Sequence, residues 1–101
     1  NPLWERAECE WWAPSKRRHH PNLMLRHPGR RPSPEENLPK ITAPTLILKA
    51  DAEGDLREQN KVAAALLPNG RIVHVPGAGH CVRRDQKAEA LRLLRAFLAE
   101  I

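Results

Sequence analysis

The stretch IVHVPGAGHCV, residues 72–82, places one imidazole at the end of a glycine-rich turn. An imidazole titrates near neutral pH, so a histidine can accept a proton and return it within one reaction cycle. Gly77 and Gly79 permit backbone angles that other residues resist, which lets the chain turn sharply and point His80 outward. These residues predict general acid–base chemistry at His80. The alternative is a bystander histidine on a turn that needs its glycines, because so short a motif recurs by chance.

Two short strands and a helix must position this turn. Residues 71–75, RIVHV, predict the strand that delivers it, and an apolar run over residues 45–50 predicts an earlier strand. A continuous apolar run fits a strand buried on both faces of a parallel sheet. Between the two strands we predict a helix over residues 57–67, with Asp55 and Glu58 as a capping pair at its start.

Residues 85–101 predict a final amphipathic helix. Its apolar positions recur at spacings of three and four along one side: Ala90, Leu91, Leu94, Phe97, Leu98 and Ile101. The order strand, helix, strand, helix predicts an α/β fold with two parallel strands joined by a right-handed crossover. His80 then follows the carboxyl end of a parallel strand, where open α/β sheets hold their ligands.

The first part of the chain differs from the rest in composition. Residues 1–40 hold seven of the ten prolines and +3 of the net charge of +5. We predict a helix with Asn1 as its cap that ends or bends at Pro14, followed by an irregular connector over residues 21–40. The predicted division is therefore an arm over residues 1–40 and a packed part over residues 41–101.

The elements predicted from this chain are too few to cover both faces of so apolar a sheet. Two parallel strands have two faces to cover, and parallel sheets are normally sandwiched between layers of helices. Two helices and a proline-rich arm are thin cover for a strand as apolar as TLIL, and the chain begins with Asn1 rather than methionine. We therefore expect this chain to be part of a longer protein whose sheet continues in other residues.

The string ITAPTLILKADAEGD, followed by LLPNGRIVHVPGAGHCVRRDQ and LRAFLAEI, resembles the C-terminal portion of the α/β-hydrolase fold family. The resemblance covers about residues 38–101. In that family a strand leads to a loop with the acidic member of a catalytic triad, and a later strand ends in a P-G-x-G-H turn whose histidine is the base. Residues 1–37 look like the end of the mobile lid that such enzymes insert before the first of these strands. The resemblance implies a partial α/β-hydrolase fold.

The same resemblance implies roles for individual residues. His80 matches the triad histidine, a general base toward a serine and then a general acid toward the leaving group. Asp51, directly after the first strand, and Glu53 are alternatives for the triad acid. Asp51 is slightly favoured, because relatives with A-D at the strand end resemble this chain more. We expect Asp55 to solvate the loop or cap the helix instead.

The family's nucleophile is absent from this sequence. It lies in a G-x-S-x-G turn upstream of the lid, and the oxyanion hole uses backbone amides from the same half of the fold. No G-x-S-x-G occurs here, and Ser15 and Ser33 lack flanking glycines. We predict that the chain is inactive alone. The implied whole enzyme hydrolyses an ester or related acyl bond of a small molecule, uses no metal or organic cofactor, and takes its serine from an N-terminal half.

Composition sets further expectations. Cys9 and Cys81 form neither a disulfide framework nor a C-x-x-C motif, so we expect a reduced, cytoplasmic setting. No run of about 18 apolar residues exists, so we expect no membrane span. The spacing of Cys9 with His19, His20 and His27 fits no zinc site, and we expect no metal.

Two neighbours of the candidate base also carry chemistry-bearing groups. His74 lies inside the second predicted strand, and we expect a packed or edge histidine rather than a catalyst. Cys81 follows His80 directly, and we expect a small buried residue rather than a nucleophile.

Two other classes of function fit parts of the sequence. A non-catalytic binding or scaffold relative of the fold would keep the strands and lack the serine. A small basic protein would hold nucleic-acid phosphates with the runs at 16–20 and 26–32 and stack bases on Trp11 and Trp12. The tryptophans precede the basic runs instead of alternating with them, so we do not expect nucleic-acid binding.

Overall fold

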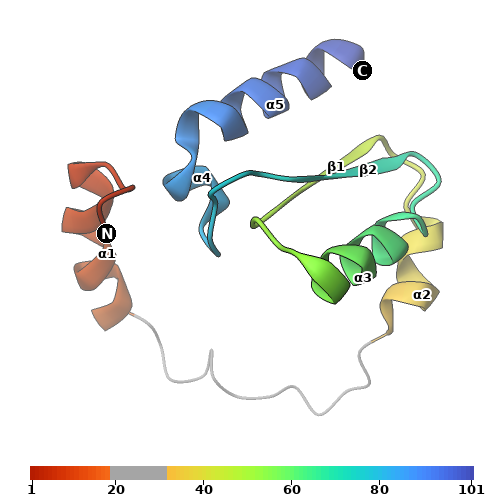
Figure 1. Cartoon of the computed structure of the whole chain (residues 1–101), viewed down its shortest axis with the longest axis horizontal. Coiled ribbons are helices and arrows are strands. Elements are labelled where there is room, and N and C mark those ends of the chain that lie inside the picture. Colours follow the sequence, from red (N-terminus) through yellow and green to blue (C-terminus); the bar gives the residue numbers. More distant parts are fainter. Residues whose placement is uncertain (19–31) are drawn as a thin grey trace. The chain divides into compact units, whose positions relative to one another are not determined.

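The computed structural model describes residues 1–18 and 32–101. The chain divides into two compact units, residues 1–31 and residues 32–101. In chain order, the described elements are α1 (Arg6–Arg17), α2 (Pro34–Asn37), the 3₁₀ helix η2 (Leu38–Lys40), β1 (Thr45–Lys49), α3 (Gly54–Ala64), β2 (Gly70–His74), α4 (Val82–Asp85) and α5 (Lys87–Glu100) (Figure 1).

Helix α1 in the first unit begins later than the sequence predicts. Asn1 Oδ1 accepts a hydrogen bond from the Leu3 N–H at 3.1 Å, which holds a turn over the first residues. The helix starts only after Glu5, so the prediction that Asn1 caps it is wrong. Pro14 lies inside α1, which continues to Arg17. A proline inside a helix lacks an N–H donor and crowds the carbonyl four residues before it, but the residues beyond it can still complete the last turn.

Residues 33–40 form two short helical segments, so the prediction of an irregular connector is wrong there. Ser33 is the N-cap of α2: its hydroxyl accepts a hydrogen bond from the Glu36 N–H, and the Glu36 carboxylate accepts one from the Ser33 N–H, both at 3.3 Å. Pro34 occupies the first helical turn, where a missing N–H costs nothing. The structure groups residues 32–40 with the rest of the second unit.

The two strands pair in parallel, as predicted. Thr45 lies opposite Gly70 and Lys49 lies opposite His74. Each strand is within one residue of its predicted bounds at both ends, and α3 connects them. The α/β character and the order strand, helix, strand, helix are therefore confirmed.

Helices α3 and α5 cover opposite faces of the sheet (Figure 1). On one face, His74 of β2 meets Asn60 of α3. On the other face, the Arg71 guanidinium lies over the Phe97 ring of α5, 5.4 Å from its centroid. Residues 71 and 74 point to opposite faces because side chains alternate along a strand.

The buried apolar core of the second unit is small and consists mostly of alanine: Ala52, Ala64, Leu67, Val75, Ala78 and Ala90. The side chains from Thr45 to Leu48 are only half-buried, so the prediction of a strand buried on both faces is wrong. Among the described residues the sheet has two strands, and each is therefore an edge strand with one helix on each face. A sheet this narrow leaves its strand residues partly open to solvent.

Helix α3 begins three residues earlier than predicted. Its N-cap is Glu53, so Asp55 lies in the first turn, where its charge already interacts favourably with the helix dipole. Glu58 forms an ion pair with Lys61 at 2.7 Å instead of reaching back to the helix start. The predicted capping pair of Asp55 and Glu58 is wrong.

The final helix is interrupted at Gln86, whose φ of −135° and ψ of 59° lie outside the helical region. The predicted apolar stripe of α5 is also split. Ala90 is buried and Phe97 is half-buried, while the other members are exposed: Leu91, Leu94, Leu98 and Ile101. A two-stranded sheet is too narrow to cover the whole stripe. Within residues 1–18 and 32–101, no helix has the length and apolar character needed to cross a membrane.

A substitution at Gly70 tests the packing at the start of β2. A Cβ atom there would lie 2.4 Å from the Leu67 Cβ, far inside contact distance. We expect Gly70→Ala to lower the free energy of unfolding by about 2 kcal/mol through overpacking, measured by denaturant titration of circular dichroism. Gly54→Ala is the control: it has a positive φ of 56° but nothing within 4 Å of the new Cβ. An equal or smaller loss for Gly70→Ala would contradict this packing.

Candidate active site

The turn after β2 is held by its own backbone geometry. Gly77 has a φ of 70°, a conformation that side chains with a Cβ resist. The Ala78 N–H donates to the Val75 carbonyl at 3.1 Å and closes the turn. Gly79 has no positive φ, so the expectation that both glycines serve backbone angles is confirmed only for Gly77.

Asp51 joins the loop after β1 to this turn. Its N–H donates to the Ala78 carbonyl at 2.8 Å, and its Oδ2 accepts from the Gly77 N–H at 2.9 Å. Its Oδ1 lies 3.9 Å from a guanidinium nitrogen of Arg57, which itself donates to the Ala52 carbonyl at 3.1 Å. The carboxyl ends of the two parallel strands are thus tied together through one aspartate.

The His80 side chain is exposed just beyond this tie. The structure brings Asp51 to the turn that carries His80, through two hydrogen bonds, one with Gly77 and one with Ala78. Within residues 1–18 and 32–101, no hydrogen bond joins the imidazole to Asp51 or to Glu53. The loops that carry Asp51 and His80 are therefore in contact, but the hydrogen bond between an acid and the histidine that a catalytic triad needs is not formed.

Glu53 and Asp55 take part in the start of α3. The exposed Glu53 is the N-cap residue, but its side chain makes no capping hydrogen bond. Asp55 follows in the first turn and lines a separate open pocket with Glu35 and Glu58. Of the three loop carboxylates, Asp51 is the one that contacts the turn before His80.

His80 lines an open pocket of about 420 Å³. The pocket combines apolar and basic groups: Leu48, Cys81, Val82, Arg83, Arg84 and Ala90 make up the rest of its lining. Leu48 comes from β1 and Ala90 from α5, so the pocket opens along the sheet face that α5 covers. Cys81, at the N-cap position of α4, is half-buried there, a smaller degree of burial than the sequence predicts.

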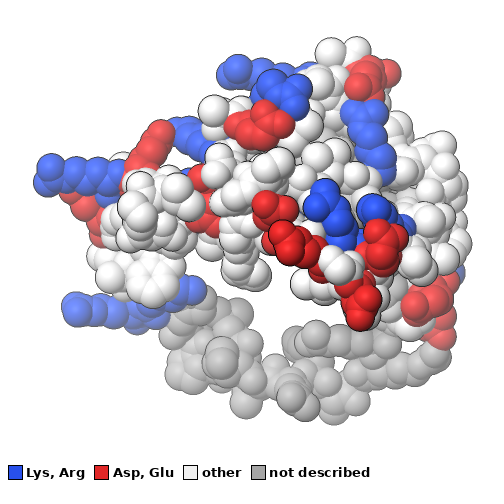
Figure 2. All heavy atoms as spheres, viewed as in Figure 1, with Lys and Arg blue, Asp and Glu red and all other residues white. Residues whose placement is uncertain are grey.

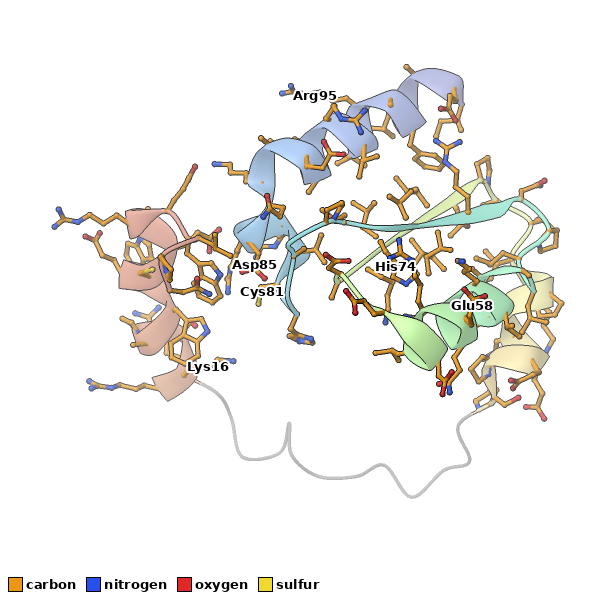
Figure 3. The ribbon with its side chains drawn as sticks, in the orientation of Figure 1. Lys16, Glu58, His74, Cys81, Asp85 and Arg95 are labelled. Atoms are coloured by element: carbon orange, nitrogen blue, oxygen red, sulfur yellow. The ribbon has the colours of Figure 1, made fainter. Side chains whose placement is uncertain are left out.

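The sequence did not reveal two residues that hold the turn. Asp85 is 9% exposed, and its Oδ2 accepts from the Gly79 N–H at 2.9 Å. The Gln86 Nε2 donates to the Gly77 carbonyl at 3.4 Å. Both lie in a stretch of charged and polar residues. Nothing in the local sequence indicates that Asp85 is buried while the arginines before it are typical of a surface. Figure 3 labels Asp85 and Cys81 where the turn after β2 meets α4.

His74 is buried, as predicted, and lies against α3 (Figure 3). The Asn60 Nδ2 lies 3.3 Å from the His74 Nε2. An amide nitrogen can only donate, so Nε2 accepts and the neutral ring carries its proton on Nδ1. Burial lowers the pKa of His74 from 6.5, and the positive charges of Arg57 and Lys61 lower it further.

The remaining sequence hypotheses concern groups of the arm. Cys9 is exposed, while His19, His20 and His27 lie outside the described residues. No cluster of three potential metal ligands occurs in residues 1–18 and 32–101. Of the run at 16–20, Lys16, Arg17 and Arg18 lie at the end of α1, while its last two residues and nearly all of the run at 26–32 lie outside the described residues. On the face drawn in Figure 2, basic and acidic side chains are interspersed.

His74 makes the stability of the second unit depend on pH. Because the pKa is lowered in the folded state, the unfolded chain binds more protons, and stability falls as the pH drops below about 6.5 toward the folded pKa. Protonation also removes the acceptor that Asn60 uses. We expect His74→Gln, whose carbonyl can still accept from Asn60, to lose less stability than the unmodified chain between pH 7 and pH 5 in denaturant titrations. Identical pH dependence in the two proteins would contradict this assignment.

No protein-family model, no curated protein and no solved structure matches the chain.

Proposed function

We propose that this chain is the C-terminal part of an α/β-hydrolase-fold enzyme that hydrolyses an ester or related acyl bond, with His80 as its base and Asp51 as its triad acid. The serine and the oxyanion hole come from residues outside the chain. The proposal starts from the sequence resemblance at residues 38–101 and from the parallel pair of strands, whose carboxyl ends carry these two residues.

One observation carries the proposal. The Asp51 carboxylate and amide both bond to the turn that delivers His80, at 2.9 Å and 2.8 Å. A triad needs its acid and its base on neighbouring loops, since the carboxylate must orient the imidazole. The Asp51 Oδ2 is used by the Gly77 N–H, and its Oδ1 is 3.9 Å from Arg57, too far for a hydrogen bond. Oδ1 therefore has the capacity to accept an N–H of His80 when the exposed imidazole turns toward it.

In the proposed reaction, His80 removes the proton of the serine hydroxyl as the serine oxygen attacks the acyl carbon. The protonated imidazole then gives that proton to the departing alcohol, which leaves an acyl-serine. Water attacks the acyl-serine in turn, His80 accepts its proton and returns it to the serine oxygen, and the carboxylic acid leaves. The Asp51 carboxylate keeps its charge throughout and stabilises the imidazolium.

Exposed apolar surface is consistent with a piece of a larger fold. Leu56 and Val62 on α3 are 58% and 68% exposed, and Leu98 on α5 is 56% exposed. The strand residues between these helices are half-buried. In the proposed enzyme, the remaining strands and helices cover these side chains.

The first experiment is to sequence the DNA upstream of the Asn1 codon and to express the whole reading frame. We expect a strand followed by G-x-S-x-G upstream, and turnover of a p-nitrophenyl ester by the whole protein. His80→Ala should then lower kcat by roughly 10⁴-fold or more, because the serine loses its base. Asp51→Asn should lower kcat more than Glu53→Gln does.

Asp55→Asn is the matched control, since this exposed carboxylate lies in the first turn of α3 and does not contact the turn before His80. It should keep the activity of the unmodified protein. A frame without G-x-S-x-G, or a His80→Ala variant with unchanged turnover, would refute the enzyme proposal and favour a non-catalytic relative of the fold.

The 101-residue chain supplies a separate prediction. It should neither turn over the ester nor react with a fluorophosphonate probe, because it holds no activated serine. Labelling at Ser15 or Ser33, located by mass spectrometry, would show that the nucleophile lies within the chain and would overturn the proposed division of the triad.

A further inference from the structure

We propose that Asp85 is a positioning residue for His80. It fixes the backbone from which the imidazole projects, by accepting the amide N–H of the residue just before it. The significance for catalysis rests on the proposed function, but the contact between Asp85 and Gly79 can be tested without it.

The burial of Asp85 indicates that its carboxylate has a structural task. Asp85 is only 9% exposed, and its Oδ2 lies 2.9 Å from the Gly79 nitrogen. Burying a carboxylate is costly unless hydrogen bonds compensate. A bond from a backbone N–H to an ionised acceptor is about twice as strong as one between neutral groups. Asp85 therefore holds Gly79 more firmly than a neutral acceptor would.

The carboxylate also lies close to the position that a side chain at residue 79 would take. A Cβ atom at this position would lie 3.0 Å from the Asp85 Oδ2. Since the φ of Gly79 is not positive, its backbone conformation alone would admit other residues. A side chain at residue 79 would therefore crowd Asp85, whose carboxylate would have to move by a few tenths of an ångström.

Asp85 completes a set of three bonded amides. The Gly77 N–H donates to Asp51, the Ala78 N–H donates to Val75, and the Gly79 N–H donates to Asp85. The two carboxylates approach from different elements, Asp51 from the loop after β1 and Asp85 from α4. Every amide of residues 77–79 is therefore committed, and the backbone that leads into His80 is fixed from both sides.

The test uses amide hydrogen exchange by NMR in the 101-residue chain. In Asp85→Ala we expect the Gly79 amide to exchange at least about tenfold faster and to move upfield, because the charged acceptor is gone. Asp85→Asn should restore most of the protection, because its carbonyl can still accept. Asp55→Ala, an exposed acid elsewhere in the unit, should leave the Gly79 amide unchanged. Unaltered Gly79 exchange in Asp85→Ala, with the β2 amides still protected, would overturn the proposal.

A double-mutant cycle keeps the test decisive if Asp85→Ala does not fold. Gly79→Ala should destabilise the unmodified chain, since the new Cβ displaces the carboxylate. With Asp85→Ser, whose shorter side chain removes the close contact, the same substitution should be tolerated better, with a coupling of about threefold or more in the unfolding equilibrium constant. Additive effects of the two substitutions would overturn the contact.

Measurements of kcat and KM in the whole protein test the role of Asp85 independently of the proposed function. Loss of kcat with little change in KM for Asp85→Ala, and rescue by Asp85→Asn, is the result expected of a positioning residue. If the exchange and cycle results hold but the whole protein has no esterase activity, the hydrolase proposal fails and the Asp85–Gly79 contact stands. If the protein is active and Asp85→Ala keeps full kcat, the positioning role fails alone.

Discussion

The bond from the Gly77 amide to the Asp51 carboxylate is the contact on which the rest of the second unit depends. It closes the space between the loops that follow β1 and β2, and α3 starts only three residues after Asp51. The same turn then leads through His80 into α4 and α5. A parallel pair of strands has no hairpin to tie its ends together. Here side-chain and backbone bonds of one aspartate take over that function at the carboxyl edge.

Local sequence patterns predicted the elements that depend on local interactions. The apolar runs gave both strands within one residue, and the Pro-Gly-Ala-Gly segment gave the turn that ends in His80. The capping box of Ser33 and Glu36 was also visible as S-x-x-E in the sequence, but the prolines around it favoured a connector. The helix start at Gly54 was missed because Asp55 and Glu58 offered an equally good capping pattern three residues later.

Features set by tertiary contacts could not be predicted from the sequence. Asp85 follows two arginines in a stretch with the composition of a surface helix, yet it is buried and accepts the Gly79 N–H. The apolar stripe of α5 indicated a single buried face. Its division into buried Ala90 and exposed Leu94 depends on the width of the sheet beneath it. Likewise, the sequence placed Asp51 and His80 at strand ends, but the hydrogen bonds between their loops depend on the register in which the two strands pair.

The alanine-rich core has a calorimetric consequence. Four of the six buried apolar residues are alanines, and Val75 is the one large side chain among the described residues that is fully buried. The heat-capacity change of unfolding grows with the apolar area that becomes exposed, and alanines expose little. The second unit should therefore unfold with a small heat-capacity increment and a small enthalpy, and hence over a broad temperature range.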